Sequence, residues 1–136
     1  MDLFEYQGKE FFADYGMPVS PGKLALTTEE AVTAAENLGY PVMVKAQVHT
    51  GGRGKAGGVK FASNIDEVSE HAENILGLDI NGHVVERLWI EKASDIADEY
   101  YASFTLDRSA KKHLAQWKQK KPTQTDNRQA AIKQPF

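Results

Sequence analysis

The sequence predicts an α/β or α+β domain with a mixed, at least partly antiparallel sheet. Two observations support this fold class. Helical and strand-like segments are interleaved through about residue 106, in the order α, β, α, β, β, α, β, β. A glycine-rich loop, residues 51–58, joins two strand-like segments rather than a strand and a helix. We therefore expect a flap between two strands as the most unusual feature of the sheet.

Capping residues and apolar spacing predict three helices. The first follows Asp2, which we interpret as its N-cap. The second begins with a capping box formed by Thr27 and Glu30. The third begins at Asn64, carries apolar residues at helical spacing, and ends at Gly77.

Runs of β-branched and apolar residues predict the strands. They are expected at 23–26, 41–48, 59–62, 84–93 and 100–106. Side chains alternate between the two faces of a strand, so Lys45 points to one face, opposite to its neighbours Val44 and Ala46.

Composition excludes several classes of protein. The chain has no cysteine, which excludes disulfides and thiolate metal sites. No apolar run approaches the roughly 20 residues of a membrane span, so no membrane association is expected. The start of the chain has neither a basic n-region nor an apolar h-region of a secretory signal. We therefore expect a cytoplasmic protein.

The glycine-rich loop contains a G-x-G-x-x-G pattern at residues 52–57. A dinucleotide site requires a helix after these glycines, but a strand-like segment follows. A P-loop requires Ser or Thr after the lysine, and Lys55 is followed by Ala56. The remaining interpretations are a phosphate-binding flap and a plain flexible hairpin. Glycine amides together with the cations Arg53, Lys55 and Lys45 favour phosphate binding.

Three segments resemble the β subunit of succinyl-CoA synthetase, an ADP- or GDP-forming succinate–CoA ligase. The longest is the Lys-x-Gln-x-His-x-Gly-Gly-Arg-Gly-Lys-x-Gly-Gly stretch at residues 45–58. The others are the start of the chain, with Met-Asp-Leu-Phe-Glu-Tyr-Gln-Gly-Lys at residues 1–9 and Tyr-Gly-Met-Pro-Val at residues 15–19, and residues 90–101. The likeness covers about residues 1–113.

The resemblance implies a partial ATP-grasp fold and a site for ATP or GTP. It also implies a partner, an α subunit that carries the CoA site and a phosphorylated histidine. In that family Mg²⁺ is bound by ligands that we expect to be absent from this chain, and no catalytic residue or metal ligand is assigned here. The residues that the resemblance places at the nucleotide are Lys45, Gly52, Arg53, Gly54, Glu91, Ser94 and Glu99.

The likeness stops near residue 113, where the charge also changes sign. Residues 1–108 carry 9 basic and 18 acidic residues, whereas residues 109–136 carry 7 and 1. We therefore expect a domain over residues 1–113 and a polar basic tail, disordered or weakly helical, over 114–136. The tail has only two aromatic residues, Trp117 and Phe136, and no predicted fold, so no nucleic-acid partner is expected. One hypothesis is that the tail is translated out of frame, which leaves a truncated chain without activity of its own.

Overall fold

The computed structural model describes residues 2–120, which divide into two compact units, residues 2–94 and 95–120. The first unit contains a four-stranded sheet in the order β1 (Gly22–Ala25), β6 (Leu88–Lys92), β2 (Val42–Ala46) and β3 (Val59–Ala62). All neighbouring strands in it are antiparallel. The predicted fold class, helices with an antiparallel sheet as in a partial ATP-grasp fold, is confirmed.

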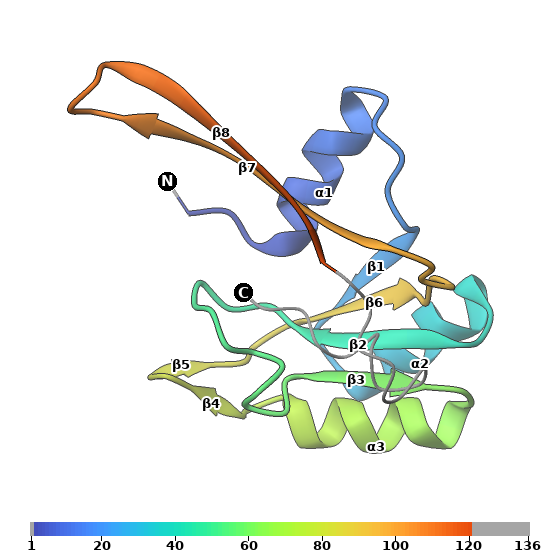
Figure 1. Cartoon of the computed structure of the whole chain (residues 1–136). Helices are drawn as coiled ribbons and strands as arrows, with labels where there is room; N and C mark the ends of the chain where they lie inside the picture. Colours follow the sequence, from blue (N-terminus) through green and yellow to red (C-terminus); the bar gives the residue numbers. More distant parts are fainter. Residues whose placement is uncertain (1, 121–136) are drawn as a thin grey trace. The chain divides into compact units, whose positions relative to one another are not determined.

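Two helices, α2 (Thr28–Leu38) and α3 (Ile65–Ile75), pack side by side against one face of this sheet (Figure 1). Both predicted N-caps are present: the Thr27 hydroxyl accepts from the third helical amide at 3.2 Å, and the Asn64 side chain does so at 2.9 Å. Small residues of α2 allow the helix to approach the strands closely. The core between helices and sheet consists of Ala25, Ala31, Ala34, Ala35, Val42, Val44, Ala46, Ala62, Val68, Ala72, Ile75, Ile80, Val85, Leu88 and Ile90.

The first helix, α1 (Glu5–Asp14), buries none of its residues completely. Its predicted N-cap was wrong, because the helix begins three residues after Asp2. The N-cap position is Phe4, whose backbone N–H donates to the Gln7 side chain at 3.0 Å. A glutamine at the third helical position thus satisfies the amide at the helix start without a side-chain acceptor at the cap.

The strand predicted at residues 84–93 is two strands in the structure. A small hairpin of β4 (Asp79–Ile80) and β5 (His83–Val84) turns at Asn81 and Gly82, both with positive φ. Val85 then exchanges hydrogen bonds with the loop after α3, and β6 begins only at residue 88. The chain changes its pairing partner between these strands, which interrupts the ladder.

The second unit is a hairpin of β7 (Glu99–Asp107) and β8 (Lys112–Lys120), paired from Glu99 opposite Lys120 to Asp107 opposite Lys112. The prediction of a disordered or helical segment was therefore wrong for residues 114–120. Trp117 alternates with polar neighbours and lies against Tyr100 in a tilted arrangement, with ring centroids 5.5 Å apart. Pairing with β7 stabilises β8 as a strand, although its sequence lacks the aliphatic alternation that would have predicted one. The rest of the predicted tail, residues 121–136, lies outside the described residues.

None of the helices in residues 2–120 has the length and apolar character needed to cross a membrane.

Candidate functional site

The site lies on the face of the four-stranded sheet that α2 and α3 leave uncovered. Lys45 on β2 and Glu91 on β6 point to this face, because they alternate with core residues Val44 and Ile90. Each is only 6% exposed. Lys45 Nζ lies 2.9 Å from Glu91 Oε2, and the indole Nε1 of Trp89 donates to the same oxygen at 3.0 Å. The prediction that Lys45 leaves the strand toward one face is confirmed.

The glycine-rich loop between β2 and β3 folds back on itself rather than extending as an open hairpin. Its last three amides donate within the loop: Ala56 to Gly52 at 3.0 Å, Gly57 to Gly54 at 3.2 Å, and Gly58 to Arg53 at 2.8 Å. Gly52 and Gly57 have φ values of 81° and 83°, which favour glycine.

Close packing also restricts the end of this loop. A Cβ added to Gly58 would lie 2.8 Å from Ile80 Cδ1 and 3.1 Å from the Cβ of Ala46. The glycines therefore serve both the turn and the approach of the loop to the sheet.

The side chain of Arg53 points back from the loop to the sheet. Its NH1 donates to the carbonyl oxygen of Ala46 at 2.9 Å and to Glu5 Oε2 at 2.8 Å. Lys55, the other cation of the loop, is exposed. Arg53 is thus the loop cation that joins the charged cluster on the sheet.

Helix α1 contributes two charged residues to the same cluster. Glu5 Oε1 lies 3.1 Å from Lys45 Nζ, and Lys9 Nζ donates to both carboxylate oxygens of Glu91 at 2.7 Å. Burial by itself raises the pKa of Glu5. The charges and hydrogen bonds of Lys45 and Arg53 outweigh that effect and lower the pKa of this carboxyl to about 2.

The cluster contains three cations, Lys9, Lys45 and Arg53, and two carboxylates, Glu5 and Glu91. It is therefore positive by one charge. A largely buried cluster with excess positive charge favours an anion as its ligand, because charges interact more strongly where water is excluded.

Backbone amides of the loop add further donors. Among residues 2–120, the N–H groups of Gly52, Arg53 and Gly54 have no hydrogen-bond partner, whereas the carbonyl groups of all three accept from within the loop. Successive free amides in a glycine-rich turn form an anion-binding concavity. The loop therefore offers amide donors next to the side chain of Arg53.

The structure brings Lys45, Arg53 and Glu91 together, with Gly52 and Gly54 flanking Arg53. Ser94 is exposed, and its hydroxyl lies 3.1 Å from that of Ser20. Glu99 is the first residue of β7 and belongs to the second unit. Their predicted nucleotide contacts remain a proposal.

Two residues of the cluster, Glu5 and Lys9, were not predicted as site residues. They lie four residues apart on α1, and Lys9 Nζ is 3.8 Å from Glu5 Oε1. Such a pair on a helix is typical of a solvated face. The signal available in the sequence was their position inside the first segment that resembles the synthetase family.

The described residues do not fit a magnesium site. Within residues 2–120 no group of three or more His, Asp or Glu side chains could hold a metal ion. The two buried carboxylates, Glu5 and Glu91, are already paired with lysine and arginine. No step through a metal ion is therefore derived for this chain.

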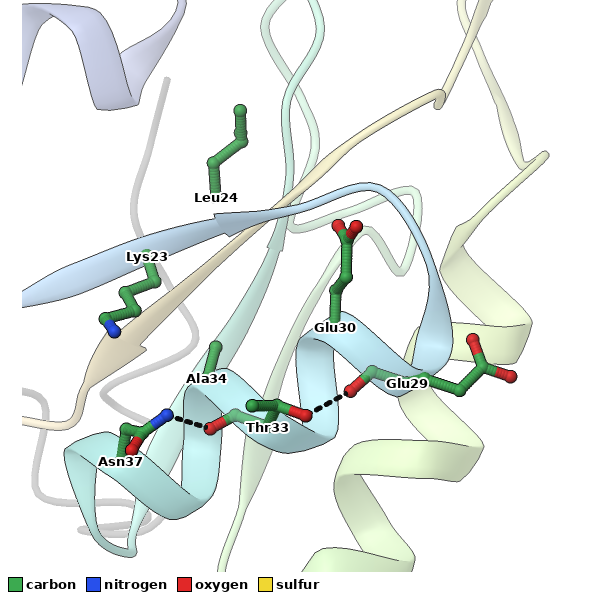
Figure 2. Close-up of a pocket in the computed structure, with 7 residues that line it drawn as sticks. All are labelled: Lys23, Leu24, Glu29, Glu30, Thr33, Ala34 and Asn37. Carbon is green, nitrogen blue, oxygen red and sulfur yellow. Dashed lines mark hydrogen bonds between the residues drawn. The ribbon is translucent and has the colours of Figure 1, made fainter.

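A hollow lies between β1 and α2, and none of the cluster residues lines it (Figure 2). On α2 the Thr33 hydroxyl donates to the Glu29 carbonyl at 2.9 Å, and the Asn37 amide donates to the Thr33 carbonyl at 2.8 Å. These two polar side chains of the hollow are thus already paired with backbone carbonyl groups of α2. The lining residues are Lys23, Leu24, Glu29, Glu30, Thr33, Ala34 and Asn37.

Comparisons with known proteins identify the family. A family model of the ATP-grasp domain matches residues 2–120. The chain therefore belongs to the ATP-grasp family.

Solved structures agree with this assignment. Acetyl-coenzyme A synthetase 1 of Ca. Korarchaeum cryptofilum, in complex with coenzyme A, Ca-AMPCP and HgCl+, is 25% identical with a TM-score of 0.71. That match covers 87% of this chain and 53% of the synthetase chain. A Pyrococcus horikoshii protein is 24% identical with a TM-score of 0.72, over 88% of this chain and 52% of its own.

A more distant match is phosphoribosylamine–glycine ligase of Thermotoga maritima. It is 18% identical with a TM-score of 0.58, over 84% of this chain and 27% of the ligase. This similarity concerns the fold alone. The chain spans about half the length of the synthetase and of the Pyrococcus horikoshii protein.

Proposed function

We propose that this chain is part of the nucleotide-binding unit of an acyl-CoA ligase, and that it binds the phosphates of ATP or GTP. The observation that carries the proposal is that Lys45 and Arg53 meet at the carboxylate of Glu5, while the loop that carries Arg53 has amides, at residues 52–54, without a partner among residues 2–120. In proteins, phosphate oxygens accept hydrogen bonds from lysine ammonium groups, arginine guanidinium groups and backbone N–H groups. Membership of the ATP-grasp family supports the nucleotide as the source of these phosphates.

The full-length enzyme of this proposal is a succinyl-CoA synthetase, with this chain in its β subunit. It joins succinate to CoA while ATP or GTP is converted to the diphosphate and phosphate. The partner is an α subunit that carries the CoA site and the phosphohistidine. Glu91, Ser94 and Glu99 are proposed to contact the nucleotide beyond its phosphates. A structural match to an acetyl-coenzyme A synthetase supports CoA ligation as the reaction class.

Two alternatives remain within this proposal. A related acyl-CoA ligase, such as malate–CoA ligase, shares the same sequence pattern. The other is a fragment that binds nucleotide or the partner subunit without turnover, which agrees with the lack of a metal-ligand cluster in residues 2–120. Mixing the chain with an α subunit and measuring succinate- and malate-dependent ligation separates them, since only a catalytic β subunit restores turnover.

Calorimetric titration of the 136-residue chain with ATP, ADP and GTP tests the nucleotide site. We expect Lys45→Gln to weaken ATP binding by about tenfold or more, the usual effect of losing one charged hydrogen bond. Lys60→Gln is the matched control, because Lys60 is exposed on the neighbouring strand β3 and pairs with Val44, on the helix-covered face. Arg53→Gln should weaken ATP binding similarly.

The proposal fails if the wild-type chain binds none of the three nucleotides at millimolar concentration. It fails equally if Lys45→Gln and Lys60→Gln, both folded by circular dichroism, bind ATP with the same affinity as the wild-type chain.

A further inference from the structure

One carboxylate joins the strand cation and the loop cation of the site. The two oxygens of Glu5 divide between Lys45 Nζ, at 3.1 Å, and Arg53 NH1, at 2.8 Å. The three residues come from α1, β2 and the glycine-rich loop. Glu5 is 40 residues from Lys45 and 48 residues from Arg53 in the sequence. The carboxylate of Glu5 therefore bridges the ammonium group of Lys45 and the guanidinium group of Arg53.

Residues at the start of α1, and Phe4 just before it, contact the strand β6, the loop and the end of β2 around this site. Phe4, just before the helix, stacks on His49 with ring centroids 3.8 Å apart, and the Tyr6 amide donates to the Gln47 side chain at 3.2 Å. Lys9 reaches Glu91. No residue of α1 is fully buried, and the helix meets the sheet face and the loop through polar groups and an aromatic contact beside it.

The charge balance makes Glu5 necessary for this arrangement. Without it, Lys45 and Arg53 would repel one another across the same space, with Glu91 left as the only carboxylate of the cluster. Arg53 would retain only the Ala46 carbonyl as a partner and would be free to leave the sheet. Cations that are already oriented lose less conformational freedom when a ligand binds, and this raises affinity.

We propose that Glu5 is a positioning residue that holds Lys45 and Arg53, and with Arg53 the glycine-rich loop, in the arrangement that receives nucleotide phosphates. The inference rests on the proposed function and adds a residue to it. Glu5 acts through the two cations and does not itself contact the phosphates, because like charges repel. Its low pKa keeps the carboxyl ionised at neutral pH, with or without a ligand.

Glu5→Gln in the 136-residue chain tests this role, because glutamine keeps the shape but removes the charge. Glu10→Gln is the matched control, since Glu10 is exposed on the same helix. We expect Glu5→Gln to weaken ATP binding by about tenfold or more, a typical loss for a charged hydrogen bond, and Glu10→Gln to leave it unchanged. Glu5→Asp keeps the charge but is shorter, so it should restore part of the affinity.

Hydrogen exchange without nucleotide provides a second measurement, which a general effect on stability would not reproduce. The amides of Ala56, Gly57 and Gly58, which donate within the loop, should lose more protection in Glu5→Gln than the amides of α2 and α3, whose protection falls only with the unfolding free energy of the unit. Equal changes throughout the first unit would mean that Glu5 stabilises the fold only, and would overturn the proposal.

The outcomes separate this inference from the proposed function. If the wild-type chain binds no ATP, the proposed function and this inference fall together. If it binds ATP and Glu5→Gln binds equally well, only the positioning role is wrong. Tighter binding by Glu5→Gln would mean that the carboxylate occupies the place of a phosphate, which also overturns it. If Glu5→Gln does not fold, intermediate ATP affinity of Glu5→Asp with faster loop exchange supports the proposal, and wild-type affinity refutes it.

Discussion

Acid should destabilise the first unit through Glu5. The pKa of this carboxyl is lowered from 4.5 to about 2 in the folded chain, because Lys45 and Arg53 outweigh the effect of burial. A group with a lowered folded-state pKa contributes stability above its unfolded pKa. That contribution is lost as the pH falls from about 4.5 toward about 2.

The size of the effect follows from the same two pKa values. Complete protonation of Glu5 corresponds to about 3 kcal/mol of unfolding free energy. Between about pH 7 and about pH 3 the loss is about 2 kcal/mol, because the folded carboxyl is still mostly ionised at the lower pH. This is a large part of the about 5–15 kcal/mol that stabilises a typical domain.

The assay is urea unfolding at several pH values, followed by tryptophan fluorescence. The chain has two tryptophans, and a Trp117→Phe background leaves Trp89 as the reporter of the first unit. Three chains are compared in that background: one with Glu5 and Glu10 intact, one with Glu5→Gln, and one with Glu10→Gln. The pKa of Glu67 is also lowered, first by the backbone N–H of Ser63, but this contribution is common to all three and cancels.

The unfolding free energy of the chain with Glu5 intact, and of Glu10→Gln, should fall about 2 kcal/mol further than that of Glu5→Gln between about pH 7 and about pH 3. Parallel pH profiles for all three chains would refute the reasoning, since they would mean that Glu5 is not held ionised by the two cations.

Two further substitutions test packing and capping. Gly22→Ala places a Cβ directly against Trp89 Cζ2, too close for two carbon atoms, so the indole that donates to Glu91 must move. We expect a loss of about 1–3 kcal/mol in urea unfolding and a changed near-ultraviolet circular dichroism signal, whereas Gly8→Ala, which meets nothing within 4 Å, should not destabilise. An unchanged indole signal would contradict this. Asn64→Ala removes the acceptor for the third amide of α3, at 2.9 Å, and should cost about 1 kcal/mol in the same assay. Asn64→Asp, which keeps the acceptor, should be near wild type, and equal losses for both would exclude capping as the cause.

Local signals in the sequence were sufficient for most helices and strands of the first unit. Thr27 and Asn64 were recognisable as caps because capping depends on side chains within three residues of the helix start. Local signals failed where pairing is distant. β8 was missed because its stability comes from a register with β7, and the break before β6 was missed because the chain changes partner there.

The family's loop pattern and the alternation along β2 predicted Lys45 and Arg53 as candidate site residues, and the structure places both in one charged cluster. Alternation decides which face a strand residue meets, and glycine spacing decides that a turn with free amides follows. The sequence could not show that Glu91 is buried beside Lys45, because that depends on the pairing of β2 with β6.

The sequence by itself determined most elements of the first unit, the glycine-rich loop and the face on which Lys45 lies, because each depends on residues close together in the chain. Only the tertiary structure decided that Glu5 and Lys9 meet the cations and carboxylate of the sheet. Their partners are 40 to 82 residues away, and no local pattern distinguishes a charge that will be buried from one that stays in water.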